Sequence, residues 1–231
     1  MTTEHTVRAY DEELDGLTAE LSRMGGLTEM EVSDSIRAIS RRDMILAQQV
    51  IARDARLDEI ELDIERRAIR LIALRQPVAD DLRRTFAALK ISMNLERCGD
   101  LAKNIAKRAI VIAESEPLTP LTRSIERMGE LVSARLKDVL DAFAARDVER
   151  AKAVWQRDQE VDEHYDSIFR ELLTYMMGDP RMIGSCAHLL FVAKNLERIG
   201  DHATNIAEII HYEITGVELT DQRPKVDALE R

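Results

Sequence analysis

The sequence predicts an all-α protein with two repeated three-helix bundles: six long antiparallel helices with pseudo-twofold symmetry. The first observation is the composition: 45% of the 231 residues are hydrophobic and 33% are charged, with only 9 Gly and 5 Pro. Such a chain favours long helices and has too few turn formers for a β-sandwich. The second is apolar residues recurring three and four positions apart. The third is an internal repeat, which predicts the two bundles.

The first three helices are expected over residues 5–39, 42–75 and 79–115. The apolar pattern of the first resumes directly after Gly25-Gly26, so it continues through the pair. A turn at Arg42-Asp43 separates it from the second, since aspartate caps a following helix. The second ends before Pro77, because proline disfavours helical geometry in the preceding residue. The third ends before Pro117.

The last three helices are expected over residues 120–144, 147–177 and 181–215. The Arg-Asp turn recurs at Arg146-Asp147, and Gly178-Asp179-Pro180 ends the fifth helix. The predicted domains are therefore a bundle over 5–115, a bundle over 120–215 and a tail over 216–231. The tail lacks sustained periodicity, so we expect it to fray.

The internal repeat is read directly from the sequence. The thirteen residues from Asn94 to Ala106 match those from Asn195 to Ala207 at ten positions, with an offset of 101. Arg42-Asp43 recurs as Arg146-Asp147, with an offset of 104. Gly99 and Gly200 lie inside the matched stretch, where a mid-helix glycine costs about 1 kcal/mol against alanine. We expect each to mark the close approach of a neighbouring helix or of a ligand, with helix packing favoured.

Charge and cysteine content limit the class of protein. The formal net charge is −10, which argues against a general nucleic-acid binder, since that function needs a basic face. The chain has two cysteines, and its first fourteen residues lack the apolar run of a signal peptide. No apolar stretch reaches membrane-spanning length. We expect a soluble, cytoplasmic protein.

Acidic residues repeat on the second and third helices of each half. Residues four apart share one helix face, and these two helices are neighbours in an antiparallel bundle. Four carboxylates per half are therefore expected to converge. The eight candidates are Asp54, Asp58, Glu96, Asp100, Asp158, Asp162, Glu197 and Asp201.

Two uses of these carboxylates stay open at this stage. Hard oxygen ligands suit Mn, Fe, Mg or Ca, and a dedicated zinc site is less expected because no Cys or His joins the repeated set. Alternatively, Arg97 and Arg198 form ion pairs with the acids and no metal binds. Asn104 and Asn205 are expected to be buried amides, bonded to a backbone turn or orienting the carboxylates.

The double motif N-L-E-R-x-G-D-x-A-x-N-I-A, with Arg75-Gln76-Pro77 and Asp81-Leu82-Arg83 in the first half, closely resembles the PhoU family. These are accessory and regulatory proteins of phosphate transport. The resemblance implies a site for multinuclear iron or another divalent metal (Mn, Zn, Mg) at the eight acids.

The resemblance also implies a function. It is that of a cytoplasmic, homodimeric, non-enzymatic adaptor that couples the phosphate-specific ABC transporter, through its ATPase subunit, to a phosphate-sensing histidine kinase. In this role it negatively regulates the phosphate-starvation response and phosphate uptake, and it meets the membrane only through these partners.

Two other hypotheses stay beside the adaptor. One is a carboxylate-bridged di-metal protein, a ferritin-like enzyme or metal store, in which Glu-x-x-His motifs would face each other across the bundle. Gly99 and Gly200 stand where those histidines would be. The other is a helical scaffold without a ligand. No catalytic residue is expected.

Overall fold

The computed structural model describes residues 2–115 and 119–219, with side chains from residue 12 in the first range and from residue 120 in the second. Within these ranges the chain is helical and contains no strand. Its helices are α1 (Thr2–Arg41), α2 (Met44–Arg75), α3 (Ala79–Ala113), α4 (Thr119–Ala145), α5 (Val148–Gln156), α6 (Gln159–Gly178), the 3-10 helix η1 (Pro180–Met182) and α7 (Ile183–Thr215). The expected break at Pro117 and the tail beyond residue 219 lie outside the described residues.

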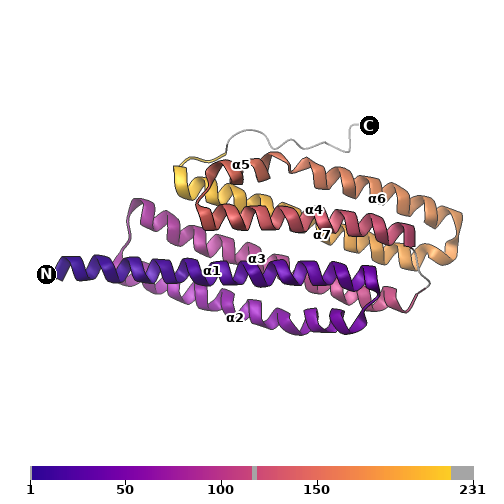
Figure 1. The fold of residues 1–231 in the computed structure, drawn as a ribbon, viewed down its shortest axis with the longest axis horizontal. Coiled ribbons are helices and arrows are strands. Elements are labelled where there is room, and N and C mark those ends of the chain that lie inside the picture. The colour runs from indigo at the N-terminus through magenta and orange to yellow at the C-terminus, as the bar shows by residue number, and fades with distance from the viewer. Residues whose placement is uncertain (1, 116–118, 220–231) are drawn as a thin grey trace.

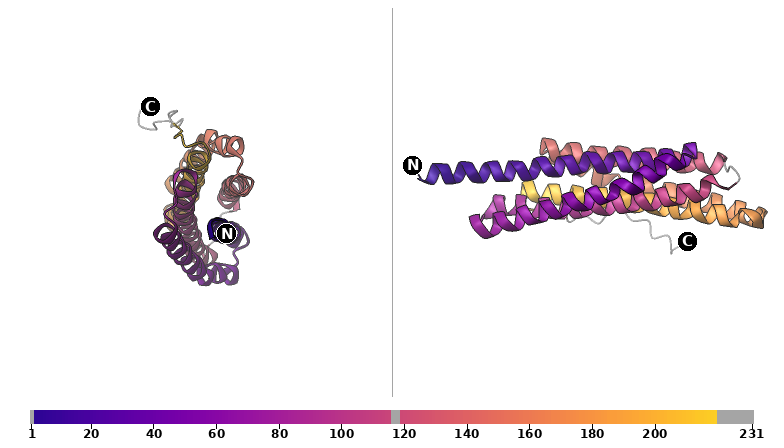
Figure 2. Two further views of the ribbon diagram at one scale, coloured as in Figure 1. Left: turned by 90° about the vertical axis from the view of Figure 1, so that its left-hand side faces the viewer. Right: turned by 90° about the horizontal axis from the view of Figure 1, so that it is seen from below.

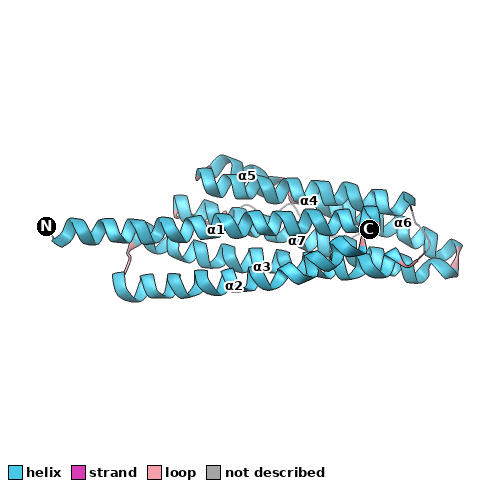
Figure 3. Cartoon of the chain, turned by 60° about the horizontal axis from the view of Figure 1, so that its bottom comes forward, coloured by secondary structure: helices cyan, strands magenta, loops and turns pink. Residues whose placement is uncertain are grey.

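The helices form two bundles lying side by side (Figure 1). Helices α1, α2 and α3 form the first, and α4, the α5–α6 pair and α7 form the second. The end-on view in Figure 2 shows an arc with α2 at one end and α5–α6 at the other. Figure 3 shows that the axes of the long helices are nearly aligned with one another. The predicted all-α fold of two three-helix bundles is confirmed.

Equivalent turns begin the second helix of each half. Asp43 caps α2 by accepting a hydrogen bond from the backbone N–H of Leu46 at 2.9 Å, and Asp147 caps α5 by accepting one from Arg150 at 3.0 Å. The preceding arginines, Arg42 and Arg146, both have a positive φ, 54° and 51°. A side-chain oxygen that satisfies a free N–H at a helix start stabilises it by about 1 kcal/mol. The offset of 104 found in the sequence is therefore also a structural equivalence.

The fifth predicted helix, 147–177, is interrupted in the structure, which corrects its expected continuity. Helix α5 ends at Gln156 and α6 begins at Gln159. At the break the backbone carbonyl oxygens of Arg157 and Asp158 accept hydrogen bonds from the guanidinium of Arg135 on α4. These carbonyls bond to a neighbouring helix, while the N–H groups of Arg157 and Asp158 bond to the carbonyls three residues back, at 3.2 and 3.3 Å, as in a 3-10 turn. A tertiary contact therefore overrides the helical pattern.

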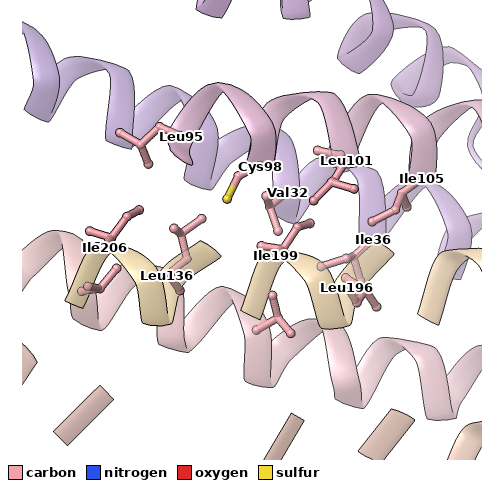
Figure 4. Close-up of a cluster of buried hydrophobic side chains, with 14 of the residues drawn as sticks. Val32, Ile36, Leu95, Cys98, Leu101, Ile105, Leu136, Leu196, Ile199 and Ile206 are labelled. Atoms are coloured by element: carbon pink, nitrogen blue, oxygen red, sulfur yellow. The ribbon is translucent and has the colours of Figure 1, made fainter. Parts of the chain in front are cut away.

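The two halves share one hydrophobic core (Figure 4). Its centre contains equivalent pairs: Val32 of α1 with Leu136 of α4, and Cys98 of α3 with Ile199 of α7. All four side chains are fully buried. Helices α3 and α7 run antiparallel, because Asn94 bonds to His202 while Arg108, further along α3, bonds to His188, earlier in α7. A pseudo-twofold axis between these helices relates the halves.

Glycine brings α1 and α4 close together at two equivalent points. A Cβ added to Gly25 would lie 2.6 Å from Leu140 Cδ2, and one added to Gly129 would lie 2.7 Å from Ile36 Cδ1. Gly25 and Gly129 are 104 residues apart, as are Ile36 and Leu140. The same glycine-to-aliphatic contact is therefore made twice across the axis. Gly25 does not interrupt α1.

We predict that Gly129→Ala destabilises the protein by about 1–3 kcal/mol, because its Cβ would overlap three atoms of Ile36. Ile36 is β-branched and restricted at χ1 in a helix, so it cannot rotate away freely. The matched control is Gly26→Ala, which meets nothing within 4 Å and should gain up to about 1 kcal/mol from helix propensity. Urea unfolding of both variants measures the difference. Equal stability changes would contradict close packing at Gly129.

Candidate functional site

The first acidic cluster (Asp54, Asp58, Glu96, Asp100) lies between α2 and α3. Asp54 is its most buried member, with 5% of its surface exposed. The Lys103 ammonium donates to Asp54 Oδ2 at 2.5 Å and to Asp100 Oδ1 at 3.2 Å. The ammonium therefore joins a carboxylate of α2 to one of α3.

The other members of the first acidic cluster act on one another electrostatically. The pKa of Glu96 is raised by partial burial, and then by the negative charge of Asp100. The pKa of Asp58 is raised by burial and then by Asp54, although Lys103 opposes the shift. Neighbouring like charges disfavour ionisation. The structure thus brings the four predicted acids of the first half into each other's field.

Glu31 of α1 is a fifth acid here, and sequence reasoning missed it. Only 1% of its surface is exposed, and its Oε2 has no hydrogen-bond partner. Burial, followed by the charge of Asp54, raises its pKa to about 7. The available signal was the position of Glu31 three residues after Thr28 and directly before Val32, both of which are buried.

The second acidic cluster (Asp158, Asp162, Glu197, Asp201) has a different partner set around its buried aspartate. Asp158 Oδ1 accepts a hydrogen bond from Thr204 Oγ1 at 2.7 Å and lies 3.8 Å from Arg135 Nη1. Only 2% of the Arg135 side chain is exposed. This guanidinium is held chiefly by backbone carbonyls. Nη1 donates to the backbone carbonyl oxygen of Asp158 at 3.2 Å, and Nη2 donates to the backbone carbonyl oxygen of Arg157.

The remaining acids of the second acidic cluster also gather. Glu197 Oε1 accepts a hydrogen bond from Lys194 at 2.7 Å, whereas its buried Oε2 has no partner. Burial, and then the charge of Glu197, raises the pKa of Asp201 to about 6. Asp162 also has a raised pKa, caused first by burial and then by Asp158. The convergence expected from the sequence is therefore present in both halves.

The repeated glycines hold α3 and α7 against the second helices. A Cβ on Gly99 would lie 2.5 Å from Leu57 Cδ1, and one on Gly200 would lie 3.3 Å from Val161 Cγ1. Leu57 and Val161 are 104 residues apart and occupy the same place in each half. The prediction that both glycines mark a close helix contact is confirmed.

The residues expected to support the carboxylates behave unequally. The Arg97 and Arg198 side chains are both exposed. Arg97 lies 3.6 Å from Glu96 Oε2 and 3.9 Å from Asp100 Oδ2. The expectation of a buried Asn104 is wrong: it is exposed and lines a shallow groove with Arg108 and Phe191. Asn205 is half-buried. The helix face turns by about 40° with each step of four residues, which carries Asn104 out of the interface.

Metal binding at the eight carboxylates stays a prediction. Their oxygens have the chemistry that Mn or Fe prefers, and Glu31 and Glu197 carry unpartnered buried oxygens. Asp54 and Asp158, however, already have hydrogen-bonding partners in the protein. Among the residues that the structure describes, no three carboxylate, histidine or cysteine side chains are arranged to hold a metal ion. As arranged, the donors do not fit a multinuclear centre.

These features define a class: all-helical proteins with two repeated bundles and a matched acidic cluster in each. A family model described as PhoU domain matches residues 21–109 and 125–210. The chain belongs to the PhoU family.

Curated relatives match almost the whole chain. The phosphate-specific transport system accessory protein PhoU homolog of Caulobacter vibrioides is 69% identical, over 98% of this chain and 99% of its own length. The PhoU homolog of Rhizobium meliloti is 52% identical, over 98% of this chain and 96% of its own length. The relationship therefore covers both repeats.

Solved structures show the same fold. PhoU from Pseudomonas aeruginosa superposes with a TM-score of 0.84 at 39% identity, covering 90% of this chain and 100% of that one. The phosphate transport system regulatory protein PhoU from Streptococcus pneumoniae gives 0.84 at 28% identity, covering 91% of this chain and 99% of that one. No helix among the described residues has the length and apolarity needed to cross a bilayer.

We predict that Glu31 makes stability fall as pH rises. Its pKa is 4.5 when unfolded and about 7 when folded, so ionisation costs the folded state more. Relative to Glu31→Gln, the wild type should therefore lose about 1–3 kcal/mol between pH 4.5 and about 7, and nothing further above that range. Urea unfolding across the range measures this difference.

The matched control for Glu31→Gln is Glu130→Gln, at an exposed position of α4. Its stability difference from wild type should vary little over the same pH range, because an exposed acid is solvated in both states. A difference between wild type and Glu31→Gln that stays constant with pH would contradict the burial of an ionisable Glu31.

Proposed function

We propose that this protein is an accessory regulator of phosphate transport. The observation that carries the proposal is 69% identity, over nearly the full length, to a protein named as an accessory protein of the phosphate-specific transport system. The match spans both bundles. The motif pairs at Asn94–Ala106 and Asn195–Ala207 lie within the matched regions.

The finer proposal is a cytoplasmic, homodimeric adaptor that couples the ATPase subunit of a phosphate-specific ABC transporter to a phosphate-sensing histidine kinase. In this role it represses the phosphate-starvation response and restrains uptake. A surface suited to a protein partner supports the proposal. A groove of about 510 Å³ between α3 and α7 combines half-exposed aromatic rings of Phe86 and Tyr212 with the charged groups Arg83, Lys90 and Glu208. Aromatic residues and arginine are enriched at protein interfaces, and Phe86, Tyr212 and Arg83 are of these kinds.

A non-enzymatic role agrees with the chemistry of the clusters. A di-iron oxidase of the ferritin type needs histidine three residues after a ligating glutamate. Here the residues three positions after Glu96 and Glu197 are Gly99 and Gly200, and both glycines lie at close helix contacts. A ferritin-like enzyme or metal store therefore has no specific observation in its favour.

We predict that deleting the gene leaves phosphate-starvation genes switched on in phosphate-rich medium, because the adaptor that holds the kinase in its repressing state is lost. Alkaline phosphatase activity in high and low phosphate measures this response. The control is a deletion strain that carries the wild-type gene in trans, which should restore repression. Normal repression in a clean deletion without a paralogue would contradict the adaptor function.

A further inference from the structure

The two halves take the positive charge beside their buried aspartate from different helices. Helices α1 and α2 correspond to α4 and α5–α6 with an offset of 104, and α3 corresponds to α7 with an offset of 101. Glu31 is therefore equivalent to Arg135, Asp54 to Asp158, and Lys103 to Thr204. The aspartate is common to both halves. The basic residue near it belongs to the third helix in the first half and to the first helix in the second half.

In the first half, the cation comes from the third helix. Lys103 Nζ lies 2.5 Å from Asp54 Oδ2, and the first helix supplies an acid, Glu31. In the second half, the cation comes from the first helix. Arg135 is buried, with Nη1 3.8 Å from Asp158 Oδ1 and Nη2 3.6 Å from Glu160 Oε2. The third helix supplies the neutral Thr204, which donates to Asp158 at 2.7 Å.

This exchange keeps a buried carboxylate compensated in each half. A charge removed from water must be paired or hydrogen-bonded to be tolerated. An arginine and a lysine in the same half would place two cations around one aspartate, whereas a glutamate and a threonine would leave it without a cation. Each half instead has one cation: the first half has Lys103 with Glu31, and the second has Arg135 with Thr204.

We propose that Lys103 is a built-in counter-ion that takes the place of a metal ion at Asp54, and that Arg135 supplies the compensating charge near Asp158 from the first helix of its half. A divalent cation bound to a carboxylate lies about 2.0–2.6 Å from its oxygen. The Lys103 ammonium already lies at such a distance from Asp54 Oδ2. Ammonium and metal would repel each other and compete for the same lone pairs, so they are alternatives at this position.

The first test measures metal uptake by the full-length chain, purified without chelator and dialysed against Mn²⁺. The wild type and the control Lys107→Met, one turn further along α3 at an exposed position, should retain only background Mn²⁺. Lys103→Met should retain about one Mn²⁺ per chain and melt at a higher temperature with Mn²⁺ than with chelator.

Stoichiometric Mn²⁺ in the wild type would overturn the proposal. So would a Lys103→Met variant that retains no more Mn²⁺ than the wild type.

The second test transplants the first half's arrangement into the second half. Arg135→Glu alone should lower the melting temperature strongly, and Thr204→Lys alone should lower it as well, because a second cation then meets Asp158. The double variant should melt well above Arg135→Glu. This non-additivity is the signature of two residues that exchange one charge. A double variant that melts at or below Arg135→Glu would overturn the exchange.

Discussion

The packing of α3 against α7 about the pseudo-twofold axis is the contact on which the rest of the structure depends. Cys98 and Ile199 meet near that axis and are fully buried. Around it, the α1–α4 contact is fixed by Gly25 and Gly129, each lying under an aliphatic side chain of the other half. Interiors are packed as tightly as organic crystals, so residues at such contacts tolerate little change in volume.

This shared core explains why the repeats match where they do. The glycines of α3 and α7 occupy a close contact with the second helix in each half, and the equivalent positions Leu57 and Val161 pack there. Charged positions outside the contact were free to diverge, provided that each buried aspartate kept a compensating partner. Lys103 and Arg135 are the result. Two halves with one packing plan therefore have two electrostatic solutions.

Much of the fold was predictable from local signals. Pro77 and the Asp43 and Asp147 caps located helix ends, because proline geometry and N-capping act within a few residues. The interruption between α5 and α6 was not predictable in this way, since a side chain from α4 causes it.

The candidate site was predictable only in part. The eight acids stood out because four-residue spacing places them on a helix face. Glu31 and Arg135 were missed because each lies on the first helix of its half, and only alignment of α1 with α4 shows that they are equivalent. Asn104 was placed in the interface although the helix face has rotated away from it by that position.

The most direct test of the account is whether the two halves unfold together. Trp155, the single tryptophan, is buried in the second half and donates to Glu208 at 3.0 Å. Leu57→Ala removes a buried side chain from the first half, a change that typically costs 2–5 kcal/mol. The shared core predicts that Leu57→Ala lowers the urea midpoint measured by Trp155 fluorescence and the one measured by circular dichroism by the same amount, so that the two midpoints stay equal. An unchanged fluorescence midpoint with a biphasic circular dichroism curve would show that the halves are independent.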